Sequence, residues 1–116
     1  AVDLLDEVAR VSDPGRRIGV AQRLTAGKGT PAEERNRLAL RLRWVGSVLR
    51  DASVVALHAD RALIANSDLT PRLERVAEVF DAPRSVRAYA AVDRALEALD
   101  RNASPKVVAD WLVLHL

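Results

Sequence analysis

The chain has 116 residues, 49% of them apolar, and its 18 lysines and arginines against 16 acidic residues give a formal charge of +2. This length suits one domain with a core that needs no disulfide bond or metal ion. The absence of cysteine excludes zinc ribbons, iron–sulfur clusters and thiol nucleophiles. The longest charge-free stretch, 52–59, is far shorter than the roughly 20 apolar residues of a membrane span. We therefore expect a soluble, cytoplasmic protein with no membrane partner.

Prolines mark the helix starts. Four of the five follow a residue that caps helices well, in the pairs Asp13-Pro14, Thr30-Pro31, Thr70-Pro71 and Ser104-Pro105. Proline suits the first helical position because the N–H that it lacks has no partner there, while the preceding oxygen accepts an orphan N–H. Glu33 completes a capping box with Thr30, and Asp81 is close enough to cap the helix at Pro83.

Apolar residues at helical spacing give the elements in chain order. Apolar residues at helical spacing over 4–11 and over 18–24 predict two short helices, and the second of these helices is expected to end at Gly27. The third is long and carries one apolar stripe: Leu38, Leu42, Val45, Leu49, Ala52, Ala56, Ala59 and Leu63. A second stripe of Trp44, Val48 and Val55, with Leu40 further round, lies beside it. Since this helix is apolar on two faces, we expect it to run through the middle of the domain.

Three shorter helices follow. Their stripes are Leu73, Val76, Ala77 and Phe80; Val86, Tyr89, Val92, Leu96 and Leu99; and Val107, Val108, Trp111 and Leu112. No segment alternates with period two for long enough to form a strand. The pattern predicts an all-α fold over residues 1–116, a bundle of five to six helices with a long central helix. Because the chain begins at Ala1 within a helical pattern, we expect it to be part of a longer protein.

The sequence offers no catalytic constellation. Gly27-Lys28-Gly29-Thr30 lacks the lysine-serine/threonine step and the earlier glycine of a phosphate loop, so we interpret it as a turn between helices. His58 and His115 have no second ligand at the spacing of a metal site. No serine lies in a nucleophile elbow. We therefore predict a non-enzyme with no catalytic, cofactor-binding or metal-binding residues, no cofactor and no small-molecule substrate.

Five arginines follow one another without an intervening acidic residue: Arg35, Arg37, Arg41, Arg43 and Arg50. On a helix they divide between two opposite sides instead of forming one stripe. One interpretation is structural, with apolar stems along a buried seam; the other is contact with an acidic partner or nucleic acid. Single-strand binding needs exposed aromatic rings, and all four aromatic residues fall in the predicted core stripes.

The last helix carries more apolar surface than one core face requires. Val113 and Leu116 point away from Val108 and Trp111 on a helical projection. Either the long central helix covers this second side, or another chain does.

Several segments resemble the C-terminal domain of delta-prime subunits of bacterial DNA polymerase III clamp loaders. The matching residues are Leu40-Arg41-Leu42-Arg43-Trp44-Val45, Leu49-Arg50-Asp51, Asn66-Ser67-Asp68, Leu96, Leu99, Asn102 and Ser104-Pro105-Lys106. The most specific part is the leucine-bearing helix broken at Asn102 and restarted before Val107, Trp111, Leu112 and Leu114. The resemblance covers roughly residues 35–116, and the related gamma/tau subunits share this helical architecture.

The resemblance implies a helical collar domain. In that family the C-terminal domains of five subunits pack into a ring from which ATPase modules hang around primed DNA. It implies that the partners are delta and gamma/tau subunits, that DNA contact is indirect or weak, and that the ATPase-like modules precede this segment. For the subunit interface we predict Val113 and Leu116, with Arg43 and Arg50 at its rim. The alternatives are a gamma/tau-type collar domain, a helical DNA-binding domain using Arg35 to Arg50, and a small helical enzyme.

Overall fold

The computed structural model describes residues 2–11, 13–56 and 70–116. These residues contain six helices and no strand: α1 Val2–Arg10, α2 Pro14–Leu24, α3 Pro31–Ala56, α4 Thr70–Val79, α5 Ala82–Asp100 and α6 Pro105–His115. The predicted all-α fold with one long helix is confirmed. Ala59 and Leu63, assigned to the long apolar stripe, lie outside the described residues, as do His58 and the predicted turn at 66–68.

The capping residues begin the helices as expected. Asp13 Oδ1 accepts from the Gly15 N–H at 3.2 Å, and Asp81 Oδ1 accepts from the Arg84 N–H at 3.0 Å. Ser104 Oγ caps α6 by accepting from the Val107 N–H. The Thr30 cap differs in one detail. Its hydroxyl accepts from the Glu33 N–H at 3.2 Å and donates to the Glu33 carboxylate at 3.3 Å, so Glu33 bonds to the hydroxyl and not to the Thr30 backbone N–H.

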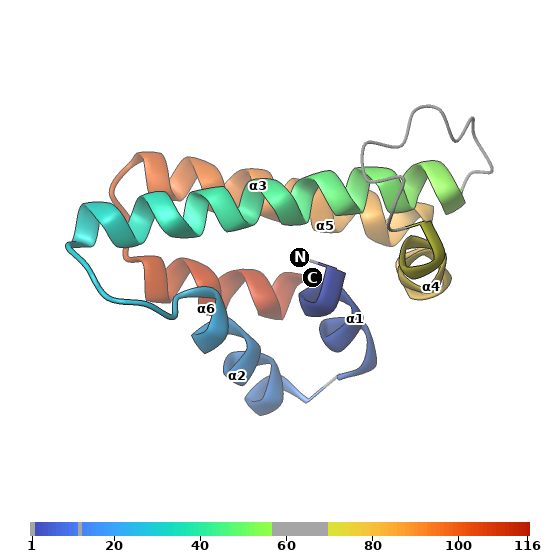
Figure 1. Ribbon diagram of the computed structural model, residues 1–116, viewed down its shortest axis with the longest axis horizontal. Helices are drawn as coiled ribbons and strands as arrows, with labels where there is room; N and C mark the ends of the chain where they lie inside the picture. Colours follow the sequence, from blue (N-terminus) through green and yellow to red (C-terminus); the bar gives the residue numbers. More distant parts are fainter. Residues whose placement is uncertain (1, 12, 57–69) are drawn as a thin grey trace.

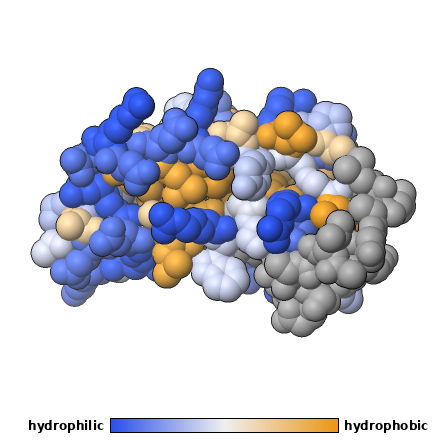
Figure 2. Space-filling model, turned by 90° about the horizontal axis from the view of Figure 1, so that it is seen from above, coloured by the Kyte–Doolittle hydropathy of each residue, from blue (hydrophilic) through white to orange (hydrophobic). Residues whose placement is uncertain are grey.

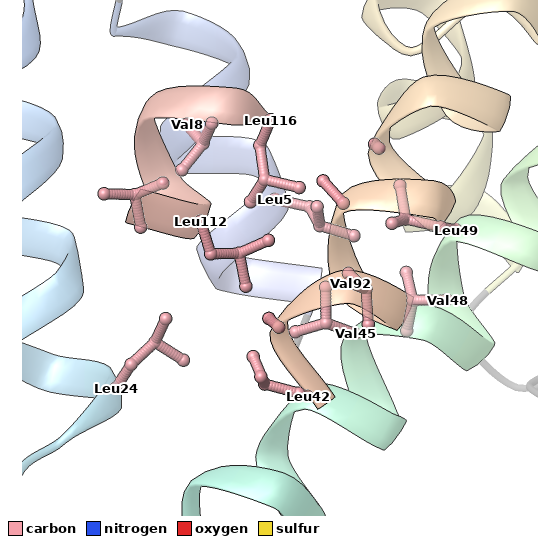
Figure 3. Close-up of a cluster of buried hydrophobic side chains, with 14 of the residues drawn as sticks. Leu5, Val8, Leu24, Leu42, Val45, Val48, Leu49, Val92, Leu112 and Leu116 are labelled. Atoms are coloured by element: carbon pink, nitrogen blue, oxygen red, sulfur yellow. The ribbon is translucent and has the colours of Figure 1, made fainter. Parts of the chain in front are cut away.

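Helices α3 and α5 lie side by side along the molecule, α3 in front of α5 in Figure 1. Helix α4 crosses one end of this pair, and α6 packs against α5 and α2 on the other side of the core. The long stripe of α3 faces inward as predicted, with Leu38, Leu42, Val45, Leu49 and Ala52 at most 1% exposed. Figure 3 shows leucines and valines of α3 facing the same interior as Leu112 and Leu116 of α6 and Leu5 and Val8 of α1.

The second stripe of α3 is only partly buried, which corrects the expectation of a helix covered on two faces. Val48 is buried and Val55 is half-buried, whereas Trp44 is 57% exposed and Leu40 is 56% exposed. Helix α3 therefore lies at the surface along one side (Figure 1). The cause is tertiary, because the neighbouring helices cover the first stripe and leave this part of α3 open.

Helix α5 is rotated relative to its predicted core face. Val86 and Tyr89, which the periodicity assigns to the core, are 67% and 43% exposed. The buried face uses small residues, namely Ser85, Ala88, Ala91 and Ala95 beside Val92 and Leu99. Small side chains let helix axes approach closely, and the interior is then filled by the leucines of neighbouring helices.

Two arginines hold the carboxyl end of α6. Arg17 on α2 donates to the Val113 carbonyl at 3.2 Å and to the Val11 and Val8 carbonyls at 2.8 and 3.3 Å, so it joins α1, α2 and α6. Arg84 donates to the Leu116 carbonyl at 3.3 Å. Partial burial, with the nearby charge of Arg17, lowers the pKa of Arg84 from its usual value. Positive groups at a helix carboxyl end also interact favourably with its dipole.

Candidate interaction surface

No group of metal-binding side chains occurs within 2–11, 13–56 and 70–116. The ring of His115 stacks on Trp111 with centroids 4.2 Å apart, and its Nδ1 lies 2.7 Å from the Trp111 carbonyl oxygen. In the same part of the chain, no helix is both long and apolar enough to cross a bilayer.

The segment 27–30 forms the predicted turn. Gly27 and Gly29 have φ of 127° and 146°, values that favour glycine, and the segment joins α2 to α3. The guanidinium of Arg37 lies against Gly27, where an added Cβ would come within 2.7 Å of its Cζ, and it donates to the Lys28 carbonyl at 3.1 Å. This side chain therefore fills the space beside Gly27 and joins the turn to α3.

The arginine run divides into two sets with different surroundings. Arg41 donates to the Leu24 carbonyl at 2.6 Å and the Ala26 carbonyl at 3.1 Å, and Arg37 holds the turn that follows. Arg41 thus bonds to carbonyls at and just after the end of α2, and Arg37 bonds to a carbonyl within the turn; the structural interpretation expected apolar stems along a buried seam and did not predict these carbonyl partners. Arg43 and Arg50 are exposed elsewhere on α3, and Arg35 is half-buried.

The predicted interface on α6 is wrong in its residues. Val113 is 0% exposed and Leu116 is 6% exposed, so both belong to the domain's own core and cannot provide a surface to another chain. Their backbone carbonyls are the acceptors for Arg17 and Arg84, which fixes this side of the helix inward. Arg43 and Arg50 are exposed but lie on a different helix, so the four residues do not form one patch.

Helix α6 nevertheless has a second apolar side that is exposed, which we call the outer stripe of α6. Val107 and Leu114 are 64% and 45% exposed, and the half-buried Trp111 lies between them in sequence. At about 100° per residue the three fall within an arc of about 60° on the helix. The spacing of four and then three residues is the signal in the sequence that identifies this outer stripe. Val108 and Leu112 of the predicted inner stripe are buried as expected, whereas Val107 is exposed, Trp111 is half-buried, and Val113 and Leu116 are buried instead. Helix packing therefore rotated the buried face of α6 away from the predicted one.

A second exposed apolar region lies over α3 and α5. Of their exposed apolar residues, Leu40 of α3 and Tyr89 of α5 line the hollows there, whereas Trp44 and Val86, also exposed, are not among the lining residues. Two adjoining hollows run between these helices and share Arg43 as a lining residue. Figure 2, which views this side, shows apolar surface between hydrophilic side chains. The expectation that all aromatic rings are buried is therefore wrong for Trp44 and Tyr89.

The floor of these hollows, which we call the α3/α5 groove, is built from small and apolar residues. It is lined by Ala39, Leu42, Gly46, Val92, Leu96 and Leu99. At Gly46 an added Cβ would lie 3.6 Å from both Tyr89 and Val92, an ordinary van der Waals distance, so α5 packs closely on α3 here. Within the described residues, the groove and the outer stripe of α6 are two separate exposed apolar surfaces.

Comparison with known proteins adds no family assignment, because no protein-family model, curated protein or solved structure matches the chain.

Proposed function

We propose that the chain is a non-catalytic subunit-assembly domain of a bacterial DNA polymerase III clamp loader, a collar domain that packs with the C-terminal domains of delta and gamma/tau subunits. The observation that carries this proposal is the pair of separate exposed apolar surfaces, one on α6 and one over α3 and α5. A member of a closed ring touches one neighbour on each side through two different surfaces. A domain with one binding partner needs only one.

The subunit type rests on the residues that resemble delta-prime. The break at Asn102, whose φ is 63°, separates α5 from α6, and the restart is capped by Ser104. These features are compatible with a gamma/tau-type collar domain as well. The sequence that precedes this segment in the whole protein discriminates between them, since an intact phosphate loop favours gamma/tau and a degenerate one with a cysteine-rich ribbon favours delta-prime.

Assembly of the full-length subunit tests the proposal. We expect Val107→Asp with Leu114→Asp to weaken assembly with delta and gamma/tau subunits roughly ten- to hundredfold, because each carboxylate would lose its water in an apolar contact. Size-exclusion chromatography with light scattering measures the complex. The matched control is Val79→Asp on α4, which places the same charge at a position 38% exposed. Unchanged assembly of the double variant would show that the outer stripe of α6 is not part of the interface.

A DNA-binding domain is the second candidate, favoured by the exposed Tyr89, which lines the same hollow as Arg43. Rings on which bases stack, together with arginines, are typical of single-strand binding. Against it, Arg37 and Arg41 are committed to backbone carbonyls, and Asp93 and Asp100 would repel phosphates at the groove. Titration with single-stranded and primed DNA separates the candidates: micromolar affinity at moderate salt with a steep salt dependence would favour DNA binding.

A further inference from the structure

We infer that the α3/α5 groove binds an amphipathic helix of a neighbouring subunit, whose acidic flank faces α3 and whose basic flank faces α5. The inference rests on the proposed function only for the source of this helix. The groove favours such a helix by its length, its shape and its charges.

The groove has the length of a helix of about four turns. Its lining extends along α3 from Ala32 to Ser47, and along α5 from Tyr89 to Asp100 with Asn102 beyond. At 1.5 Å per residue, the α3 part spans about 22 Å. Apolar grooves of this kind bind helices through residues spaced at three and four positions. The floor is apolar, and Leu40 and Tyr89 add exposed apolar area at its edges.

The two walls carry opposite charges. Arg35 and Arg43 stand on the α3 side, and Asp93 and Asp100 stand on the α5 side. None of these four side chains forms a salt bridge with another residue in the described part of the chain. A ligand with one charge sign on both flanks would meet repulsion at one wall, whereas a helix with acidic and basic flanks meets attraction at both. The charges thus select the direction in which the helix lies.

Shape favours a single helix over a symmetric dimer that pairs groove to groove. In such a dimer each copy would present the same hollow, and two concave surfaces would leave the floor of each groove unfilled. A single convex helix reaches the floor while its flanks meet the rims, which gives the close packing that stable interfaces have.

Synthetic helices provide the test. Three peptides of about 18 residues share one leucine stripe, and their flanks are glutamate on one side and lysine on the other, glutamate on both, or lysine on both. We expect the split-charge peptide to bind the chain roughly tenfold more tightly than the other two in fluorescence anisotropy at low salt, and the preference to shrink as salt screens the rims. Equal affinity of the three peptides, or no binding by the split-charge peptide, would overturn the inference.

A charge reversal in the protein tests the inference more strictly than the comparison of peptides alone. Arg43→Glu makes the α3 wall more acidic, so the preference should move toward the all-lysine peptide, a change that loss of folding cannot produce. Arg75→Glu makes the same change at an exposed position on α4 and should keep the original order. An unchanged order in Arg43→Glu would contradict the inference.

Two further outcomes separate the possible occupants. If the chain alone dimerises in sedimentation experiments and Arg43→Glu abolishes the dimer, the groove binds a second copy and the inference is wrong. If the peptides behave as expected but the full-length subunit fails to assemble with delta and gamma/tau subunits, the inference that the groove binds a helix is supported and the proposed function is contradicted.

Discussion

Both sides of α6 carry apolar residues, but one side is buried in the domain and the other is exposed. On one side, Leu112 and Val113 are fully buried, and the backbone of that side is bonded to Arg17. On the other, Val107 and Leu114 are exposed. The difference teaches that apolar content shows how many apolar faces a helix has, and that it does not show which of them the rest of the chain covers.

The largest expected effect on stability comes from shortening one leucine on each side of α6 to alanine. Leu112→Ala should lower the free energy of unfolding by about 2–5 kcal/mol, because it opens a cavity in a core where this side chain is 0% exposed. Leu114→Ala, two residues later, should change it by less than about 0.5 kcal/mol. Urea unfolding of the chain measures both, and similar losses in the two variants would contradict the assigned orientation of α6.

We expect an intermediate effect on stability from replacing Arg17, whose hydrogen bonds hold the buried side of α6 in place. Arg17→Ala removes the donor for the carbonyls of Val8, Val11 and Val113, and we expect a loss of about 1–3 kcal/mol in unfolding free energy. Arg16→Ala is the matched control, since Arg16 is exposed and adjacent. Thermal unfolding of both variants checks the prediction, and equal melting temperatures would show that Arg17 does not hold α6 in place.

The smallest effect concerns α2, the helix that packs on α6. Gly19 is exposed within α2, and a Cβ added there would meet nothing within 4 Å. Gly19→Ala should therefore stabilise the chain by about 0.5–1 kcal/mol, mainly by restricting the unfolded state. Gly27→Ala should destabilise it, because φ is 127° and the new Cβ would collide with Arg37. A loss of stability in Gly19→Ala would mean that this side of α2 is covered.

The helix boundaries could be predicted because their causes are local. Asp13, Asp81 and Ser104 accept bonds from N–H groups two or three residues away, so a short stretch of sequence contains the whole interaction. The buried stripe of α3 could be predicted equally well, because leucines and valines recur at helical spacing from Leu38 to Leu49.

The candidate surface could be predicted only in part. The sequence indicated that α6 has two apolar sides, but it assigned Val113 and Leu116 to the outside. It also placed Trp44 and Tyr89 in the core, although both are exposed. Periodicity gives the angle between two side chains on one helix, and it contains no information on which direction the rest of the chain occupies.

The sequence by itself determined where the helices begin, that the fold is all-α, and that α6 carries two apolar stripes. The tertiary structure alone decided which stripe became core, because that choice depends on contacts between distant segments such as Arg17 and Val113. It also decided the partners of Arg37 and Arg41, which are carbonyls at the far side of a turn. Local hydrogen bonds fix a helix, whereas its rotation about its own axis is fixed by whatever packs beside it.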